Sequence, residues 1–286
     1  MRVGDDLRIG TRLLVGATQV LCSSPLRRFA ALSDMAPIVK GHAVVMPLSG
    51  AQLSSTLDDE SWLDLWRTAM LAAQAAELGV GANACNLLLR EGSHAAWKDA
   101  SAHLHVVPRV PGDFARNDDV FSAMEAWVPP GSEETNGPPA WVLPDDADRK
   151  DRTTEMMADE ASVYRGYASG GVSVEATDRA FGKFTIPHEH VFYDSASQRT
   201  QAFVNLRPLA PGHVLVTPRR VVPRLVELSI EERDDLFLAV RAVVKAVVAE
   251  RAAAAGDTST VVELGIQDGR QAGQSVPHVH VHVIPR

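Results

Sequence analysis

One feature of the 286-residue sequence limits its fold more than any other: a set of short motifs occurs twice in the same order. KGHAVVMP (40–47) matches PGHVLVTP (211–218), REG (90–92) matches QDG (267–269), and HLHVVPR (103–109) matches HVHVIPR (280–286). The spacing between the paired motifs is nearly constant, which chance would rarely produce. Repetition on this scale indicates two copies of one structural unit. We therefore predict domains at 1–127 and 173–286, joined by a linker and tail helix at 128–172.

Each copy predicts the same succession of elements, namely two strands, a helix, another strand and a final strand that carries histidines. The paired strands are expected at 29–32 and 42–46, and again at 202–205 and 213–217. Ser229 and Glu232 predict a capping box at the start of the second helix, whereas Thr56 and Gly79 are expected to bound the first. The fold class is therefore α+β, with an antiparallel sheet and one covering helix in each copy. The residues 149–168 predict a polar surface helix.

Three histidines alternate with valines near the end of the second copy: His278, His280 and His282. On a strand they line one face, about 6.6 Å apart at roughly 3.3 Å per residue, while the valines face the other way. A buried imidazole needs hydrogen-bond partners, which argues against a purely structural row. A single zinc ion fits poorly, because the outer two Cα atoms lie about 13 Å apart on a straight strand. We expect no metal site.

Nucleophilic catalysis accounts for the three alternating histidines better than a structural role or a zinc site does. His280 can attack phosphorus if a hydrogen bond to its other nitrogen fixes the tautomer. The flanking histidines can then bind phosphate oxygens, and His213 on the neighbouring strand can supply a further donor. Gln274 can orient a leaving oxygen or an attacking water without adding charge.

The segment HVHVHVI (278–284) resembles the signature of the histidine triad family of nucleotide hydrolases and transferases. FGKFTIP (181–187), FVNLRPLAPGHVLVTP (203–218) and QDGRQAGQSVPHVHVHVIPR (267–286) are similar to its fragile histidine triad branch, whose members hydrolyse diadenosine triphosphate. The ending Pro285–Arg286 favours that branch over the phosphoramidase branch. The resemblance covers most of the chain, as a tandem duplication.

The resemblance implies roles for particular residues. His280 matches the nucleophile that forms a nucleotidyl-histidine intermediate, with His278, His282 and His213 as its partners. Asn205 matches a ribose contact, and Gln267, Gln274 and Ser275 match residues near the phosphates. Phe181, Ile186 and Leu215 are expected to line the adenine pocket. Family members are usually symmetric dimers, so the two copies are expected to pair as an intramolecular pseudo-dimer within a chain that is itself monomeric.

The first copy keeps His42, His103 and His105 but departs from the pattern elsewhere. Ser101 replaces the first triad histidine, Arg90 replaces Gln267, and Trp97 and Lys98 replace Gln274 and Ser275. Asp34 stands where the second copy has Asn205, a mild change. An indole cannot accept a hydrogen bond as an amide does. We expect this degenerate triad to turn over little or no substrate.

The resemblance implies a hydrolase similar to bis(5'-adenosyl)-triphosphatase, which splits diadenosine triphosphate into AMP and ADP. A nucleoside phosphoramidase that uses the same intermediate is an alternative, and so is a nucleotide-binding sensor with slow turnover. No cofactor is expected, apart from a divalent cation, Mg²⁺ or Mn²⁺, that can accompany the polyphosphate.

Composition limits the partners and the compartment. The formal net charge of −8 argues against a long nucleic-acid partner, which favours a basic surface. Two cysteines, Cys22 and Cys85, favour a reducing compartment over a disulfide framework. The N-terminal segment lacks the apolar run of a signal peptide, and charges interrupt the apolar region 236–255. We expect a cytoplasmic protein that binds a small nucleotide and contacts no membrane.

Overall fold

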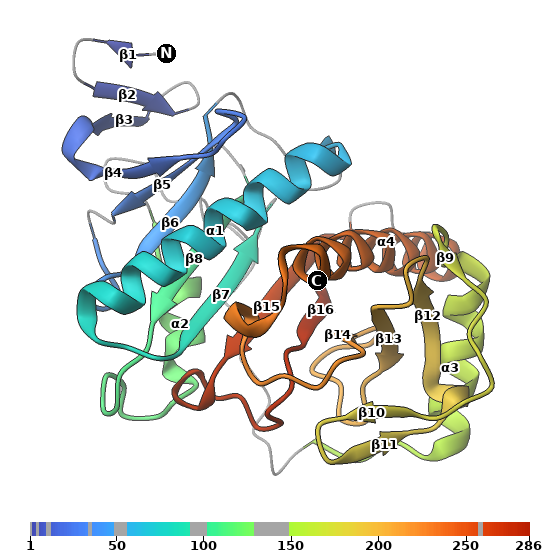
Figure 1. The fold of residues 1–286 in the computed structure, drawn as a ribbon. Helices are drawn as coiled ribbons and strands as arrows, with labels where there is room; N and C mark the ends of the chain where they lie inside the picture. The colour runs from blue at the N-terminus through green and yellow to red at the C-terminus, as the bar shows by residue number, and fades with distance from the viewer. Residues whose placement is uncertain are drawn as a thin grey trace. The chain divides into compact units, whose positions relative to one another are not determined.

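The computed structural model describes residues 2–3, 6–9, 13–33, 36–48, 56–91, 102–128, 149–256 and 260–286. The chain divides into two compact units. The first comprises Met1–Trp141 with Gln267–Gln274, and the second comprises Val142–Ile266 with Ser275–Arg286. Each unit is built around its own antiparallel sheet (Figure 1).

The sheet of the first unit has the strand order β4-β5-β6-β8-β7. Every neighbouring pair is antiparallel. Three short N-terminal strands form a separate sheet in the order β1-β2-β3. The strands of this unit are β1 (Arg2–Val3), β2 (Asp6–Ile9), β3 (Leu13–Gly16), β4 (Val20–Ser23), β5 (Phe29–Ser33), β6 (Ala43–Pro47), β7 (Cys85–Arg90) and β8 (His103–Pro108).

Helix α1 (Asp59–Val80) covers one face of this sheet, crossing β5, β6 and β8 (Figure 1). It begins at the N-cap Asp58, whose carboxylate accepts a hydrogen bond from Ser61 N over 2.7 Å, and it ends at Gly81, with φ of 70°. The predicted boundaries at Thr56 and Gly79 were therefore each two residues early. A short helix, α2 (Asp119–Glu125), packs through Val120 and Met124 against Leu88 and Val107 of the sheet.

The sheet of the second unit has the strand order β15-β16-β14-β13-β12-β9, and every neighbouring pair is antiparallel. A separate hairpin, β10-β11, lies beside it (Figure 1). The strands are β9 (Gly171–Val172), β10 (Arg179–Phe181), β11 (Phe184–Ile186), β12 (Val191–Ser195), β13 (Thr200–Val204), β14 (Val214–Pro218), β15 (Val262–Asp268) and β16 (Val281–Pro285).

Helix α4 (Ile230–Ala255) covers one face of the second sheet and sets which side chains face the other. Its start has the predicted capping box: Glu232 N donates to Ser229 Oγ over 3.2 Å, and Ser229 N donates to the Glu232 carboxylate over 2.8 Å. The apolar residues at helical spacing are buried, as are the valines that alternate with the triad histidines. These are Leu236, Val240, Val243, Val247, Val279, Val281 and Val283. Because side chains alternate across a strand, burying the valines turns the histidines to the opposite face.

Helix α3 (Thr154–Tyr167) lies at the surface, as its polar sequence predicted, but three of its residues are buried. Its N-cap Thr153 accepts a hydrogen bond from Met156 N over 3.2 Å. Met157, Ala161 and Tyr164 form a narrow buried stripe that packs against α4 and the edge of the sheet. The residues 149–153 precede the helix rather than belonging to it.

The predicted architecture is confirmed: two copies of an antiparallel sheet, each covered by a helix. The residues 129–148 of the predicted linker lie outside the described part of the chain. The pairing of the two copies as a pseudo-dimer stays a prediction. Among the described residues, no helix is both long and apolar enough to span a bilayer.

Candidate active site

The register of β14, β15 and β16 builds the centre of the site. His282 pairs with Leu215 on one side and with Gly265 on the other, so these three residues share a face. Strand β16 begins only at Val281, later than the sequence pattern suggested. Ahead of it, Val279 is tied down by other groups: its N–H donates to Val222 O over 2.7 Å, and its carbonyl accepts from Thr217 Oγ1 over 2.6 Å.

His280 is held in one tautomer by its own backbone. Its Nδ1 lies 2.7 Å from the carbonyl oxygen of His278, and because a carbonyl only accepts, Nδ1 must carry the hydrogen. The lone pair is then on Nε2, to which no described residue makes a hydrogen bond. Burial lowers the pKa of His280 to about 4, although the bond to the His278 carbonyl acts in the opposite direction. The ring is therefore neutral near pH 7, as a nucleophile must be.

His213 and His282 form an oriented pair. Leu209 N–H donates to Nδ1 of His213 over 3.0 Å, so the hydrogen of this ring lies on Nε2. That Nε2 lies 3.0 Å from Nδ1 of His282 and donates to it. The hydrogen of His282 is consequently on its own Nε2, where it can be offered to an anion. Burial is the largest cause that lowers the pKa of His282 well below the ordinary histidine value, so the donor is neutral.

His278 has both ring nitrogens engaged by the protein. Gly182 N–H donates to Nδ1 over 3.1 Å, and Nε2 donates to Pro218 O over 2.8 Å. Thr217 Oγ1 lies 3.1 Å from the same Nε2. This ring therefore joins the β10-β11 hairpin to the end of β14, and it leaves no nitrogen for a phosphate oxygen.

The model of the HIT domain matches residues 18–112 and 185–286, together more than half of the chain. The chain belongs to the HIT family.

Individual HIT proteins match over about one domain. The bifunctional bis(5'-adenosyl)-triphosphatase/adenylylsulfatase of Arabidopsis thaliana is 44% identical over 118 residues, 40% of this chain and 59% of the relative. The asymmetrical bis(5'-nucleosyl)-tetraphosphatase of Schizosaccharomyces pombe is 49% identical over 106 residues, 37% of this chain and 53% of the relative. The chain thus spans less than two thirds of both relatives. The solved diadenosine triphosphate hydrolase of Plasmodium falciparum, in complex with cyclomarin A, is 31% identical with a TM-score of 0.35, covering 43% of this chain and 81% of that one.

The predicted base-pocket residues of the second HIT domain come together. Phe181 and Leu215 are buried in one apolar cluster with Val191 and Phe203, and Ile186 packs against it. The Phe181 ring centroid lies 5.2 Å from that of His280, in an edge-to-face arrangement. An apolar surface therefore adjoins the proposed nucleophile, as binding of a flat base beside a phosphate requires.

Two arginines ahead of α3 also reach this domain's site, and sequence reasoning missed them. Arg152 Nε donates to the carbonyl of Asn205 over 2.9 Å, and Arg149 donates to the carbonyl of Arg207. Both contacts hold the loop that carries Asn205, whose amide nitrogen lies 3.3 Å from Nε2 of His213. Burial, and next to it the charge of Arg149, lower the pKa of His213 to about 3. A stretch of basic residues before a polar helix gave no signal of this role.

The predicted phosphate-side residues are placed unequally. Ser275 is exposed and begins the segment 275–286, which belongs to the second unit. Gln267 and Gln274 are the first and last residues of a segment that belongs to the first unit. Gln274 N donates to Gly269 O over 3.3 Å, which closes this segment into a loop. The contacts of the two glutamines with His280 remain a prediction.

The first HIT domain brings His42, His103 and His105 together, all buried. Arg90 is buried on the same face, paired in the sheet with His103. The other divergent positions, Asp34, Trp97, Lys98 and Ser101, lie outside the described residues.

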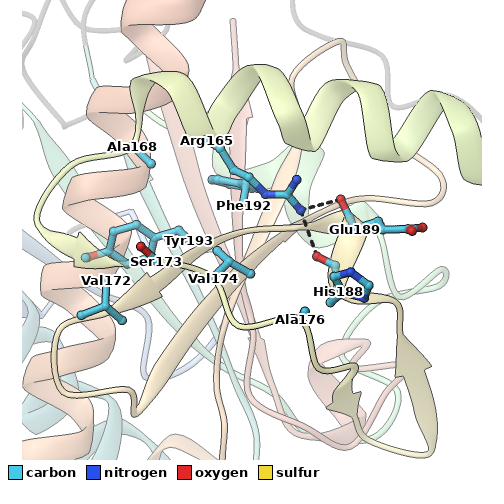
Figure 2. Close-up of a pocket in the computed structure, with 11 residues that line it drawn as sticks. Arg165, Ala168, Val172, Ser173, Val174, Ala176, His188, Glu189, Phe192 and Tyr193 are labelled. Atoms are coloured by element: carbon cyan, nitrogen blue, oxygen red, sulfur yellow. Dashed lines mark hydrogen bonds between the residues drawn. The ribbon is translucent and has the colours of Figure 1, made fainter.

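A separate pocket of about 550 Å³ lies between the end of α3 and strands β9 and β12 (Figure 2). Figure 2 shows Arg165 directed at the carbonyls of His188 and Glu189, to which it donates over 2.9 Å and 2.8 Å. None of the triad histidines lines this pocket, so it is not the proposed catalytic site. Within the described ranges, no group of three or more His, Cys, Asp or Glu side chains is arranged to hold a metal ion.

Proposed function

We propose that the second HIT domain hydrolyses dinucleoside polyphosphates, splitting diadenosine triphosphate into AMP and ADP, with His280 as the nucleophile. The observation that carries the proposal is the hydrogen bond from His280 Nδ1 to the His278 carbonyl, which leaves the lone pair on Nε2 of a neutral ring. The names of the two curated relatives, a triphosphatase and a tetraphosphatase of this kind, support the substrate class.

In the first step, Nε2 of His280 forms a bond to the α-phosphorus. The bond from that phosphorus to the bridging oxygen breaks, and ADP leaves with the electron pair. The resulting nucleotidyl-histidine ring is positively charged, and its Nδ1–H still donates to the His278 carbonyl. A hydrogen bond from a charged donor is stronger than one from a neutral ring, so this contact favours the intermediate.

In the second step, a water oxygen bonds to the phosphorus and the phosphorus–nitrogen bond breaks. The electron pair returns to Nε2, AMP is released and the proton of the water passes to solvent. We assign the Nε2–H of His282 to a non-bridging phosphate oxygen in both steps, with His213 fixing its orientation. Gln274 is proposed to orient the leaving oxygen and then the water. His278 is proposed as a positioning residue.

For substrate binding, we assign the adenine ring to the surface formed by Phe181, Ile186 and Leu215. Asn205 is proposed to contact the ribose, and Gln267 and Ser275 the phosphates. Mg²⁺ or Mn²⁺ bound to the polyphosphate can offset its charge, without a dedicated site on the protein.

We also propose that the chain is a monomer containing an internal pseudo-dimer and that it works in the cytoplasm. Both cysteines are free thiols, Cys22 partly exposed and Cys85 buried, which supports a reducing compartment.

Product analysis in ¹⁸O-water tests the proposal. Diadenosine triphosphate, diadenosine tetraphosphate and adenosine phosphoramidate are supplied in parallel. Triphosphate cleavage with ¹⁸O only in AMP supports attack at the α-phosphorus. Preference for the phosphoramidate, or turnover far below once per minute with tight binding, would instead assign a phosphoramidase or a sensor. His188→Asn, a change at a partly exposed histidine of the separate pocket, serves as the matched control and should keep full activity.

A further inference from the structure

The first HIT domain repeats the ring arrangement of the second. Ile38 N–H donates to Nδ1 of His42 over 3.3 Å, and Nε2 of His42 lies 3.1 Å from Nδ1 of His105. The repeated motifs match these rings to His213 and His282, which make the same two contacts. The hydrogen of His105 is therefore on Nε2, the atom that the second domain offers to an anion.

The indole of Trp127 covers this surface. Its ring centroid lies 6.1 Å from that of His42, 5.7 Å from His103 and 5.0 Å from His105, and the residue is 7% exposed. Nε2 of His105 is buried and makes no hydrogen bond within the described part of the chain. An unpaired buried donor is costly, and the ring that carries it contacts the indole at an interplanar angle of 89°. In the second domain, the described aromatic rings that contact His282 are only those of other histidines.

Trp127 also fills the apolar side of the first site. It packs in one cluster with Leu32 and Val44. The repeat matches these two residues to Phe203 and Leu215. Leu215 belongs to the proposed adenine surface of the second domain, and Phe203 is buried in the same apolar cluster. An indole and a purine are both flat, fused rings of one five-membered and one six-membered cycle. Trp127 therefore lies where a base and its phosphate would bind if the first domain worked like the second.

Arg90 explains how the indole is held. It stands where the second copy has Gln267, and it is 3% exposed. Its guanidinium donates to the carbonyls of Met124 and Glu125 over 3.2 Å and 3.0 Å, at the last turn of α2. It also lies 3.8 Å from the Glu125 carboxylate. These contacts fix the end of α2, two residues before Trp127. A change that removes a phosphate-side glutamine thus supplies the anchor for the ring that closes the site.

We propose that Trp127 occupies a latent purine mononucleotide site in the first HIT domain, and that removing the indole opens this site. In the wild-type chain, where the indole is present, we expect a single bound nucleotide, in the second domain. The expected number of nucleotides bound by the wild-type chain rests on the proposed function. The additional binding site expected when the indole is removed does not.

Calorimetric titration with AMP tests the inference on the full chain. We expect one AMP per chain for the wild type and two for Trp127→Ala. Photolabelling with 2-azidoadenosine monophosphate, mapped by peptide mass spectrometry, should mark first-domain peptides only in the variant. Met124→Ala is the matched control, because it removes a buried side chain from α2 but leaves the indole in place. It should destabilise the domain without adding a binding site.

Several outcomes separate this inference from the proposed function. A folded Trp127→Ala chain with wild-type stoichiometry and no new label would overturn the inference. Label in the first domain of the wild type would overturn it as well. A wild type that binds no AMP, beside a variant that binds one in its first domain, would refute the substrate site of the second domain and support the latent one. If the alanine variant fails to fold by circular dichroism, Trp127→Leu keeps apolar packing without the bicyclic ring and should show the same gain. If the leucine variant also fails to fold, the test is the photolabelling of the wild type, in which label on first-domain peptides would contradict the inference.

Discussion

His213 donates the hydrogen of its Nε2 to Nδ1 of His282 over 3.0 Å, and His42 stands in the same relation to His105 over 3.1 Å. In both domains a backbone N–H four residues earlier fixes the first ring. The oriented pair is therefore a property of the repeated fold, and it persists in a copy whose surface is covered by Trp127. The two domains differ in whether a ligand can reach the second ring of the pair, which is His282 in the second domain and His105 in the first.

Replacing His213 by alanine should lower kcat about tenfold with little change in KM, because one orienting hydrogen bond is worth about 1.4 kcal/mol at most. Steady-state kinetics on diadenosine triphosphate measures this. The matched variant is His42→Ala, which removes the corresponding ring from the first domain and should leave kcat unchanged. Equal losses in the two variants would show that the first pair also takes part in turnover.

Replacing His280 by asparagine should abolish turnover while AMP binding stays within a few-fold of the wild type. The amide keeps a hydrogen-bonding group in place but has no nucleophilic nitrogen. Acid quenching of the wild type during turnover, followed by peptide mass spectrometry, should find adenylate on the peptide containing His280. Adenylate on any other residue, or near-normal rates in the variant, would assign the nucleophile elsewhere.

The unfolding free energy should fall as the pH drops from about 6.5 towards 4. The pKa values of His213 and His280 are lowered to about 3 and about 4, so the unfolded chain binds protons in this range that the folded chain does not. Each ring contributes a slope of up to roughly 1.4 kcal/mol per pH unit, and this loss of stability disappears above about pH 6.5, where the ring is neutral in both states. Urea unfolding at pH 7, 6 and 5 measures this slope. In His213→Asn the slope should be shallower, and curves that stay parallel to the wild type would contradict the assignment.

The sequence predicted those features of the fold that depend on neighbouring residues. The capping box of Ser229 and Glu232 is local, so its motif sufficed. At the start of α1, Thr56 and Asp58 can both act as caps by residue type, so the sequence left two candidates, and the structure shows Asp58 in that position. The buried stripe of α3 was missed because it consists of only three residues, Met157, Ala161 and Tyr164, and one of them is small.

The sequence predicted candidate residues for the site but not all of their contacts. The alternating histidines indicated the family, which the HIT domain match confirms, whereas His280 as the nucleophile stays a prediction. The partners of His278 are Gly182 N, in the turn between β10 and β11, and Pro218 O, at the end of β14. Both are far away in the chain, and only the folded structure shows that the two ring nitrogens are occupied. The covering of the first site was equally hidden, because Trp127 follows a short helix outside the repeated motifs.

Gly212→Ala should destabilise the protein more than Gly170→Ala does. Both glycines have positive φ, 84° and 80°, a conformation that costs other residues roughly 1–2 kcal/mol. A Cβ at Gly212 would also lie 2.9 Å from Tyr164 Oη and 3.1 Å from Pro285 Cγ, whereas a Cβ at Gly170 meets nothing within 4 Å. The difference in urea midpoints therefore measures how tightly Tyr164 of α3 and Pro285 pack against the turn before His213. Equal midpoints would mean that the tyrosine moves aside freely.

Replacing Arg152 by alanine should raise KM about three- to tenfold with a smaller effect on kcat. The guanidinium holds the carbonyl of Asn205, and losing a charged hydrogen bond of about 1 kcal/mol loosens the loop proposed to contact the ribose. Arg165→Ala is the matched control, since that arginine also holds backbone carbonyls but not that of Asn205: it donates to His188, Glu189 and Val191. It should leave both constants unchanged. Wild-type kinetics in the Arg152 variant would show that the segment before α3 is only a connection between the domains, whereas a selective rise in KM would make it part of the binding site.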